Sequence, residues 1–574
     1  MKTKTTFPYK YTIKRTLFCL VASFFSITIT NAQTFAWAKS MGGSINEYGQ
    51  AITVDGSGNV YTTGYFTGNV DFDPGVGSFT LNCIDNGDIF VSKLDGAGNF
   101  VWAKKMAGTG AGGDTGESIT LDAAGNIYTT GRFSGTADFD PGAGTFTISA
   151  MGGYDIFISK LDASGNFVWA KSMKVSGADI GKSIKVDAAG NVYTCGSFQG
   201  TGDFDPGAGT YTLTSTGGDE IFVSKLDGSG NFVWAAALGG TGTDRCFGID
   251  LDASGNVYTN GYAGGGDFDP GVGTFNLPIG LFVSKLDNSG NFVWAKQFTG
   301  AFVNYSYAIA VDASGNVYTT GTFQGSSATD FDPNLGTFNM TGGSGSMFIS
   351  KLDAAGNFVW ARSISGANGF SIKVDAANTN IYITGYFTGT NDFDPGTGTY
   401  TLNTSGNDDV FISQLDISGN FVNALSMGSI NSDRATCIAV DAASNIYITG
   451  NYNGTVDFDP YAGIFNLSSV NSADIFVVKL NGLSTALKKE NNLSNYFLSV
   501  YPNPFSTQIT FKVKEISGNE VTIVIYNSVG QIVRTERSSS DKITILRENL
   551  TAGVYFYKAT QEGNVIASGK LIAE

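Results

Sequence analysis

Pairs of aspartates separated by one residue are the most regular candidate for chemistry in this sequence. Each pair lies in an Asp-Phe-Asp-Pro motif, and the motif occurs seven times. Carboxylates at positions i and i+2 of an extended segment point to the same side, and Ca²⁺ prefers such hard oxygen ligands. The tentative metal ligands are Asp71, Asp73, Asp138, Asp140, Asp203, Asp205, Asp267, Asp269, Asp330, Asp332, Asp392, Asp394, Asp457 and Asp459.

The same motif also has a purely structural explanation. Asp-Pro, usually followed by Gly, begins a turn, and carboxylates in such turns accept hydrogen bonds from nearby backbone N–H groups. The spacing does not match an EF-hand loop, which needs further acidic positions and a distant Glu. We therefore favour the turn, and Ca²⁺ is the one cofactor that the sequence suggests.

A second set of acids occurs in five of the seven repeats, five residues before an isoleucine in the first expected strand. These acids either ring the mouth of a central channel or accept hydrogen bonds from N–H groups at the start of the strand. A ligand site usually shows itself by breaking a repeat, and the departures here are Arg245, Arg434, Tyr305 and Tyr307. The recurring acids are Glu47, Asp114, Asp179, Asp244 and Asp433.

The elements that position these residues belong to a repeat that fills residues 35–482. Its marker is an Asp-initiated turn ending in Asn-Val-Tyr or Asn-Ile-Tyr, which recurs every 60 to 67 residues. Each unit contains four short runs with the two-residue alternation of β-strands, as at 118–122, 126–133, 155–162 and 166–173. A fixed period of this size with short β-patterned runs indicates a propeller or a solenoid. The marker asparagines are Asn59, Asn126, Asn191, Asn256, Asn316, Asn380 and Asn445.

The ends of the array favour a closed ring. The fourth run of each unit reads Phe-Val-Trp-Ala-Lys or a variant, but the seventh unit stops at 474–482 without it. The missing copy stands at residues 35–41, where it can complete the last unit and remove exposed sheet edges. We therefore predict a seven-bladed β-propeller over 33–482, closed by its N-terminal strand. One Trp at the same strand position of nearly every unit indicates packing between blades rather than sugar stacking, at Trp37, Trp102, Trp169, Trp234, Trp294 and Trp360.

Composition and the N-terminus limit the possible locations and partners. Residues 1–32 read as a secretory signal peptide, and no later segment is apolar and long enough to span a membrane. A formal net charge of −16 argues against nucleic acid and anionic membranes as partners. The absence of histidine excludes His-dependent triads and His-ligated zinc. Four cysteines follow the leader in units one, three, four and seven, and we expect no disulfide between positions so dispersed: Cys83, Cys195, Cys246 and Cys437.

A different module follows a polar linker at 483–496. Alternating strands and turns over 497–574 predict a small β-sandwich. Its segments YPNPF, IYNSVGQIV, LTAGVYFYK and GKLI resemble the C-terminal sorting domain of type IX secretion clients in Bacteroidota. That resemblance implies export across the outer membrane by the type IX machinery, to the cell surface or the medium. The repeats at 35–482 resemble the SBBP β-propeller family, which implies a fold and very little function.

Taken together, these features favour a non-enzymatic role. The first hypothesis is an exported, surface-displayed or released propeller that serves as a binding or adhesion scaffold for a glycan or a protein. A secreted carbohydrate-active enzyme with carboxylates at the propeller mouth is one alternative, although near-identical repeats count against it. The other is a calcium-stiffened structural surface protein. Propellers carry many unrelated activities, so the fold alone does not decide between them.

Overall fold

The computed structural model describes residues 33–110, 112–300, 305–325, 328–482, 497–514, 520–527, 531–548, 550–561 and 564–574. The predicted signal peptide and linker lie outside these residues. The chain divides into two compact units, Met1–Leu483 and Ser484–Glu574. Every regular element in the described residues is a β-strand, which confirms the all-β prediction. A helix able to cross a membrane is likewise not found among them.

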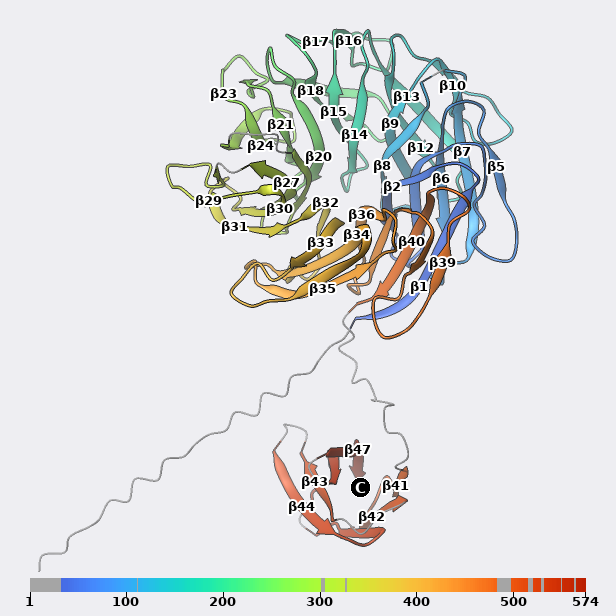
Figure 1. The fold of residues 1–574 in the computed structure, drawn as a ribbon, viewed down its shortest axis with the longest axis vertical. Coiled ribbons are helices and arrows are strands. Elements are labelled where there is room, and N and C mark those ends of the chain that lie inside the picture. The colour runs from blue at the N-terminus through green and yellow to red at the C-terminus, as the bar shows by residue number, and fades with distance from the viewer. Residues whose placement is uncertain are drawn as a thin grey trace, which may run out of the picture. The chain divides into compact units, whose positions relative to one another are not determined.

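The first unit contains seven antiparallel sheets with four principal strands each, arranged around a common centre (Figure 1). We number the sheets in chain order, and each of sheets 1 to 6 takes its four strands from one repeat. Sheet 1 comprises β2 (Glu47–Val54), β3 (Val60–Phe66), β6 (Asp88–Leu94) and β7 (Phe100–Gly108). Sheet 2 comprises β8 (Thr115–Leu121), β9 (Ile127–Phe133), β12 (Asp155–Leu161) and β13 (Phe167–Val175). Sheet 3 comprises β14 (Ile180–Val186), β15 (Val192–Phe198), β18 (Glu220–Leu226) and β19 (Phe232–Leu238).

The remaining sheets repeat this order. Sheet 4 comprises β20 (Arg245–Leu251), β21 (Val257–Ala263), β24 (Gly280–Leu286) and β25 (Phe292–Phe298). Sheet 5 comprises β26 (Tyr305–Val311), β27 (Val317–Gly325), β30 (Gly343–Leu352) and β31 (Phe358–Ser365). Sheet 6 comprises β32 (Ala367–Val374), β33 (Asn380–Asp392), β34 (Thr401–Asp416) and β35 (Phe421–Met427). Sheet 7 comprises β36 (Arg434–Val440), β37 (Ile446–Tyr452), β40 (Asp474–Asn481) and β1 (Thr34–Gly43).

Sheet 7 takes its fourth strand from the N-terminus. β1 pairs antiparallel with β40, from Thr34 opposite Asn481 to Met41 opposite Ile475, so the predicted pairing of residues 35–41 with the last unit is confirmed. The first strand of each sheet contacts the first strand of the next, and β36 of sheet 7 contacts β2 of sheet 1. The seven first strands therefore lie closest to the common axis.

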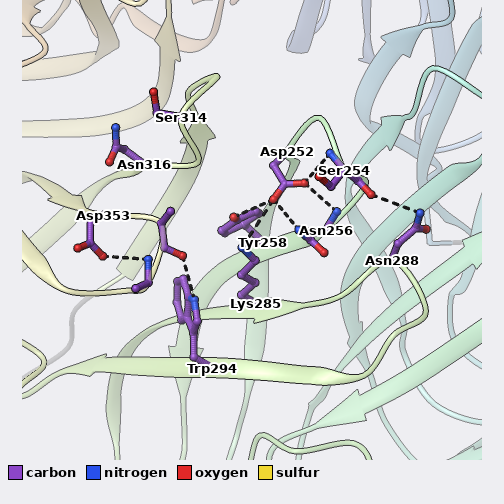
Figure 2. A network of polar contacts seen from close by, with 12 residues as sticks. Asp252, Ser254, Asn256, Tyr258, Lys285, Asn288, Trp294, Ser314, Asn316 and Asp353 are labelled. Atoms are coloured by element: carbon purple, nitrogen blue, oxygen red, sulfur yellow. Dashed lines mark hydrogen bonds and ion pairs between the residues drawn. The ribbon is translucent and has the colours of Figure 1, made fainter.

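The turn between the first two strands of a sheet is held by the aspartate of the repeat marker. In sheet 4, one oxygen of Asp252 accepts the backbone N–H groups of Ser254 and Asn256 at 2.9 and 3.0 Å. The other oxygen accepts the Asn256 side-chain amide at 2.7 Å and the Tyr258 hydroxyl at 3.0 Å (Figure 2). Lys285 Nζ lies 4.7 Å from the centroid of the Tyr258 ring. Asp, Asn and Tyr recur together in the marker because they form one hydrogen-bonded unit that fixes the turn.

The tryptophans of the fourth strands pack against the following sheet. Trp294 on β25 of sheet 4 donates its indole N–H to the carbonyl of Ala354, in a turn of sheet 5, at 3.4 Å. Trp37 on β1 reaches the carbonyl of Gly96 in the same way at 3.3 Å, which joins sheet 7 to sheet 1. The predicted role of these rings in packing between units is therefore confirmed.

A short hairpin lies between the second and third strands of each sheet, and the hairpins of sheets 1 to 3 extend the preceding sheet. β4 (Asn69–Asp71) pairs with β5 (Thr80–Asn82) and also with the end of β1. β10 pairs with β7, and β16 with β13, in the same way. The other hairpin strands are β10 (Thr136–Asp138), β11 (Thr147–Ser149), β16 (Thr201–Asp203), β17 (Thr212–Thr214), β22 (Gly266–Asp267), β23 (Asn276–Leu277), β28 (Thr329–Asp330), β29 (Asn339–Met340), β38 (Thr455–Asp457) and β39 (Asn466–Ser468).

The second unit contains two antiparallel sheets. One comprises β41 (Phe497–Tyr501), β42 (Gln508–Lys514) and β45 (Lys542–Leu546). The other comprises β44 (Ile532–Ser538), β43 (Val521–Tyr526), β46 (Gly553–Gln561) and β47 (Asn564–Ala573). Side chains from both sheets, including Phe511 and Ile523, share one buried core.

Candidate functional site

The Asp-Phe-Asp-Pro motifs lie in the hairpins between the second and third strands of the sheets. Asp71 Oδ1 accepts the backbone N–H groups of Asp73 at 3.0 Å and Phe79 at 2.8 Å, and Asp73 Oδ1 accepts that of Gly75 at 2.8 Å. Equivalent hydrogen bonds occur in the other six motifs. The phenylalanine between the aspartates, Phe72 in the first motif, is fully buried. These hydrogen bonds are the ones expected if the motif only forms a turn. Calcium binding by the other carboxylate oxygen of each aspartate stays a prediction.

The recurring acids before the first strands are buried at the boundaries between sheets. Glu47 accepts the N–H of Gly43 at 3.2 Å, and Asp179 accepts that of Gln199 at 2.7 Å, so the alternative of local hydrogen bonding describes them. Each also interacts with an acid on the third strand of the preceding sheet, which is the first residue of that strand in every case except Asp409. The five pairs are Glu47 with Asp474, Asp114 with Asp88, Asp179 with Asp155, Asp244 with Glu220, and Asp433 with Asp409.

Burial changes the proton affinity of these boundary acids. It raises the pKa of Glu47 to about 8, and the charge of Asp474 adds to this effect. Burial likewise raises the pKa of Asp114 and of Asp179 to about 7. Several boundary carboxyls therefore keep a proton near neutral pH, which limits repulsion inside each pair.

The first strands enclose a cavity of about 300 Å³ on the common axis. Each of these strands has a β-bulge near its start, where one residue has no partner on the second strand. Bulges re-aim side chains, and here they turn the extra residue toward the axis. The extra residues that line the cavity are Gln50, Glu117, Phe247, Tyr307, Phe370 and Thr436. The remaining extra residue, Lys182 on β14, forms an ion pair with Glu117 at 2.9 Å.

Aromatic rings from sheets 4, 5 and 6 form a continuous group beside this cavity. We call it the aromatic arc; its members are Phe247, Tyr262, Tyr305, Tyr307, Phe370 and Tyr386. Tyr305 and Tyr307 are stacked with centroids 5.7 Å apart, and Tyr307 lies 5.0 Å from Phe370. Phe247 contacts both tyrosines, at 5.9 and 5.5 Å. All six rings remain partly exposed, so the arc presents an apolar and hydroxyl-bearing surface to solvent.

The two arginines that break the repeat lie on first strands that also contribute to this region. The Arg434 guanidinium lies over Tyr386, 4.4 Å from the ring centroid, and pairs with Asp408. Arg245 precedes Phe247 on β20 and pairs with Asp219 at 2.8 Å. Both arginine side chains are 46% exposed. The structure thus brings Tyr305, Tyr307 and Arg434 into one surface, with Arg245 on a strand of the same surface.

Two lysines and one aspartate lie farther along the first strands. Lys185 Nζ is 2.9 Å from Asp250 Oδ1, and Asp250 Oδ2 accepts the N–H of Val311 at 2.9 Å. Burial opposes the ionisation of Asp250, but the charges of Lys185 and Lys373 outweigh it and lower the pKa of this carboxyl. The charge of Lys185, aided by burial, lowers the pKa of Lys373 to about 8. The group therefore has one net positive charge at neutral pH, inside a strongly acidic protein.

Five residues of this region were not predicted from the sequence: Phe247, Phe370, Lys185, Asp250 and Lys373. Their signal was variability at two fixed positions: the bulge, and the residue after the recurring isoleucine. The isoleucine is invariant, and Val or Leu and then Asp always follow two and three residues after it, whereas these two positions carry seven different combinations. The bulge hides this signal, because strict alternation assigns the extra residue to the wrong face.

Comparison with known proteins identifies the second unit. Residues 499–574 match the family described as the secretion system C-terminal sorting domain, so the predicted sorting domain is confirmed. The chain is exported by type IX secretion to the cell surface or the extracellular space. Over 74% of its length, the chain is 24% identical to an uncharacterized WD repeat-containing protein, L264, of Acanthamoeba polyphaga mimivirus. It spans 36% of the length of that relative.

Several solved structures are similar at low sequence identity. The β-propeller domain of Cps50 (Swd1) from Myceliophteria thermophila has a TM-score of 0.34 and 8% identity, over 72% of this chain and 96% of that domain. PorZ, described as an essential surface component of the type IX secretion system of Porphyromonas gingivalis, has a TM-score of 0.17 and 11% identity. That match covers 94% of this chain and 100% of PorZ. The strand pairing above, rather than these likenesses, establishes the all-β architecture.

Proposed function

We propose that this exported protein is a binding module, a seven-bladed propeller that captures a glycan or a protein at its axial cavity. In this proposal sheets 1 to 7 are the blades, residues 33–482 form the propeller, and β1 closes it. The linker at 483–496 separates it from a β-sandwich at 497–574, which serves sorting alone. The resemblance of the repeats to the SBBP family agrees with this organisation. The observation that carries the proposal is the aromatic arc, built from residues that differ between otherwise similar repeats.

The arc suits a ligand that has both flat apolar faces and hydroxyl groups. Aromatic rings stack on the apolar faces of sugars or on side chains, and the tyrosine hydroxyls add polar contacts. The exposed guanidinium of Arg434 offers donors at one end of the arc. Rings that already contact one another lose little freedom on binding, which favours affinity.

The two lysines that line the same cavity, Lys185 and Lys373, favour a ligand with an acidic substituent. Lys185 is neutralised by Asp250 at 2.9 Å, whereas Lys373 faces the same aspartate without a second acid. A carboxylate or sulfate that reaches Lys373 would balance the remaining charge in an enclosed space, where such pairing is strongest. We therefore expect acidic glycans or acidic side chains to bind more tightly than neutral ones.

The enzyme alternative has less support at this site. Glycoside hydrolysis generally needs two carboxyl groups that face one bond. Glu117 lines this cavity and Asp250 contacts its lining residue Lys185, and each of these two acids pairs with a lysine at 2.9 Å. Such pairing suits a ligand site better than a general acid.

A glycan array probed with the purified exported chain tests the proposal, followed by titration calorimetry of the strongest hits. Tyr307→Ala should abolish or strongly weaken binding, and Arg434→Ala should weaken it. Tyr400→Ala is a matched control, because Tyr400 is exposed but packs on Phe421, away from the arc. Equal loss of binding in Tyr307→Ala and Tyr400→Ala, or no loss in either, would contradict the assignment of the site. An array without hits would direct the search to a protein ligand, tested with the same three variants.

A further inference from the structure

Two cysteines lie side by side at the boundary between sheets 3 and 4. The Sγ atoms of Cys195 on β15 and Cys246 on β20 are 2.7 Å apart, well inside the roughly 3.5–4 Å of non-bonded heavy atoms. Both side chains are fully buried. Both thiols are free in the structure. The expectation of no disulfide rested on the separation of the units, but units three and four are neighbours and β15 contacts β20.

The equivalent positions in other repeats show that this boundary is different. At four other boundaries, a threonine on the second strand of one sheet faces a glycine on the first strand of the next. A Cβ added to Gly116 would lie 2.4 Å from Thr63 Oγ1, and one added to Gly181 would lie 2.3 Å from Thr130 Oγ1. The strands approach closely, so at these four boundaries a side chain in place of the glycine would clash with the threonine. Two sulfur atoms joined by a covalent bond fit this gap.

A second boundary also departs from the threonine–glycine pattern on both strands. Between sheets 4 and 5, Asn260 takes the threonine position and Ser306 takes the glycine position. The Asn260 amide donates to Ser306 Oγ at 2.7 Å and to the Ser306 carbonyl at 2.9 Å. At this boundary too, both positions depart from the pattern, and the two side chains are joined by a hydrogen bond.

We propose that Cys195 and Cys246 form a disulfide in the exported protein, as a covalent link between two neighbouring sheets. The two thiols lose two protons and two electrons as the S–S bond forms. The electrons pass to the disulfide of a thiol oxidase or exchange protein of the cell envelope, which is reduced to two thiols. Delivery to the cell surface or the medium places the bond where disulfides persist.

The burial of both sulfurs fixes when the bond forms. Thiol–disulfide exchange needs a thiolate that can reach the oxidant. Burial, with the hydrogen bond from Cys246, raises the pKa of the Cys195 thiol well above its usual value. The bond therefore forms before β20 packs on sheet 3, while both thiols are accessible.

Alkylation of the unfolded exported chain without reductant tests the proposal directly. After N-ethylmaleimide treatment and trypsin digestion, mass spectrometry should find residues 186–225 joined to residues 246–285. Cys83 and Cys437 should carry the label. After reduction, all four cysteines should be labelled and the joined peptide should disappear. Full labelling without reductant, or a joined peptide containing Cys83 or Cys437, would overturn the proposal.

Two variants act as controls. Cys83→Ser removes a cysteine outside the pair and should leave the joined peptide unchanged. Cys246→Ser should free Cys195 for labelling, and its label can be measured in denaturant whether or not the variant folds. Absence of label on Cys195 in this variant would mean a different partner and would contradict the assignment.

Discussion

Replacing Glu47 by glutamine should change how the stability of the propeller depends on pH. Glu47 is fully buried, accepts the N–H of Gly43 and lies near Asp474 at the boundary that closes the ring. Glutamine keeps the shape and the acceptor but cannot ionise. Because the pKa of Glu47 is raised from 4.5 to about 8, the folded state binds the proton more tightly than the unfolded state. The resulting stabilisation is complete below about pH 4.5 and is lost as the pH rises through about 8.

The size of the effect follows from the shift. One pKa unit corresponds to 1.36 kcal/mol, so a rise from 4.5 to about 8 amounts to about 5 kcal/mol at low pH. Between pH 5 and pH 8, wild type should lose about 3–4 kcal/mol through this one group. The Glu47→Gln variant should therefore gain that amount relative to wild type over the same interval.

Guanidinium unfolding followed by tryptophan fluorescence, at pH 5 and at pH 8, measures this difference. All six tryptophans lie between Trp37 and Trp360, so the signal reports the propeller alone. Glu520→Gln is the control, because Glu520 is exposed in the other unit and its loss changes the net charge equally. The reasoning is refuted if Glu47→Gln and wild type show the same shift in unfolding midpoint between the two pH values.

Three further perturbations have defined outcomes. Deletion of residues 34–43 removes the fourth strand of sheet 7 and leaves β40 as an open edge, so we expect a much lower thermal unfolding temperature and self-association by size-exclusion chromatography. If the Asp-Phe-Asp-Pro carboxylates serve the turn, Ca²⁺ in place of EDTA should leave the unfolding temperature of wild type unchanged; an increase that Asp205→Asn reduces would instead assign the metal. Binding of an acidic ligand should weaken severalfold as the pH rises from 7 to 9, because Lys373, with a pKa of about 8, loses its proton; calorimetry that shows equal affinity at both pH values, or in Lys373→Met, would exclude this lysine.

The strands and their order follow from the sequence because tandem repeats report each element seven times. The offset of the tryptophan run also identified the partner of residues 34–43, since only one sheet lacked a fourth strand. The role of the turn aspartates could also be predicted, because Asp, Asn and Tyr recur at fixed spacing to form one hydrogen-bonded unit.

The candidate site was harder to predict, because it depends on contacts between repeats. Phe247 and Tyr307 face the axis through bulges, and a bulge cannot be recognised from alternation within one short strand. Lys185 and Lys373 belong to units three and six, and only ring closure brings them together. Cys195 and Cys246 appeared unrelated for the same reason: their contact depends on the register between neighbouring sheets. Patterns within a repeat determine strands, whereas differences between repeats determine the site.

The pairing of β1 with β40 has a consequence for where the chain ends lie. Asn481 donates a side-chain hydrogen bond to Thr34 across 447 positions of sequence, yet within one sheet the two residues are neighbours. The sheets follow one another around the axis without a structural first or last member. The first and last strands of the first unit therefore only identify the sheet that contains both of them, sheet 7. A circular permutant that joins β40 to β1 by a short loop, and opens a turn of another sheet, should keep every sheet and the axial cavity. The sorting domain could then be attached at a different sheet without disturbing the aromatic arc.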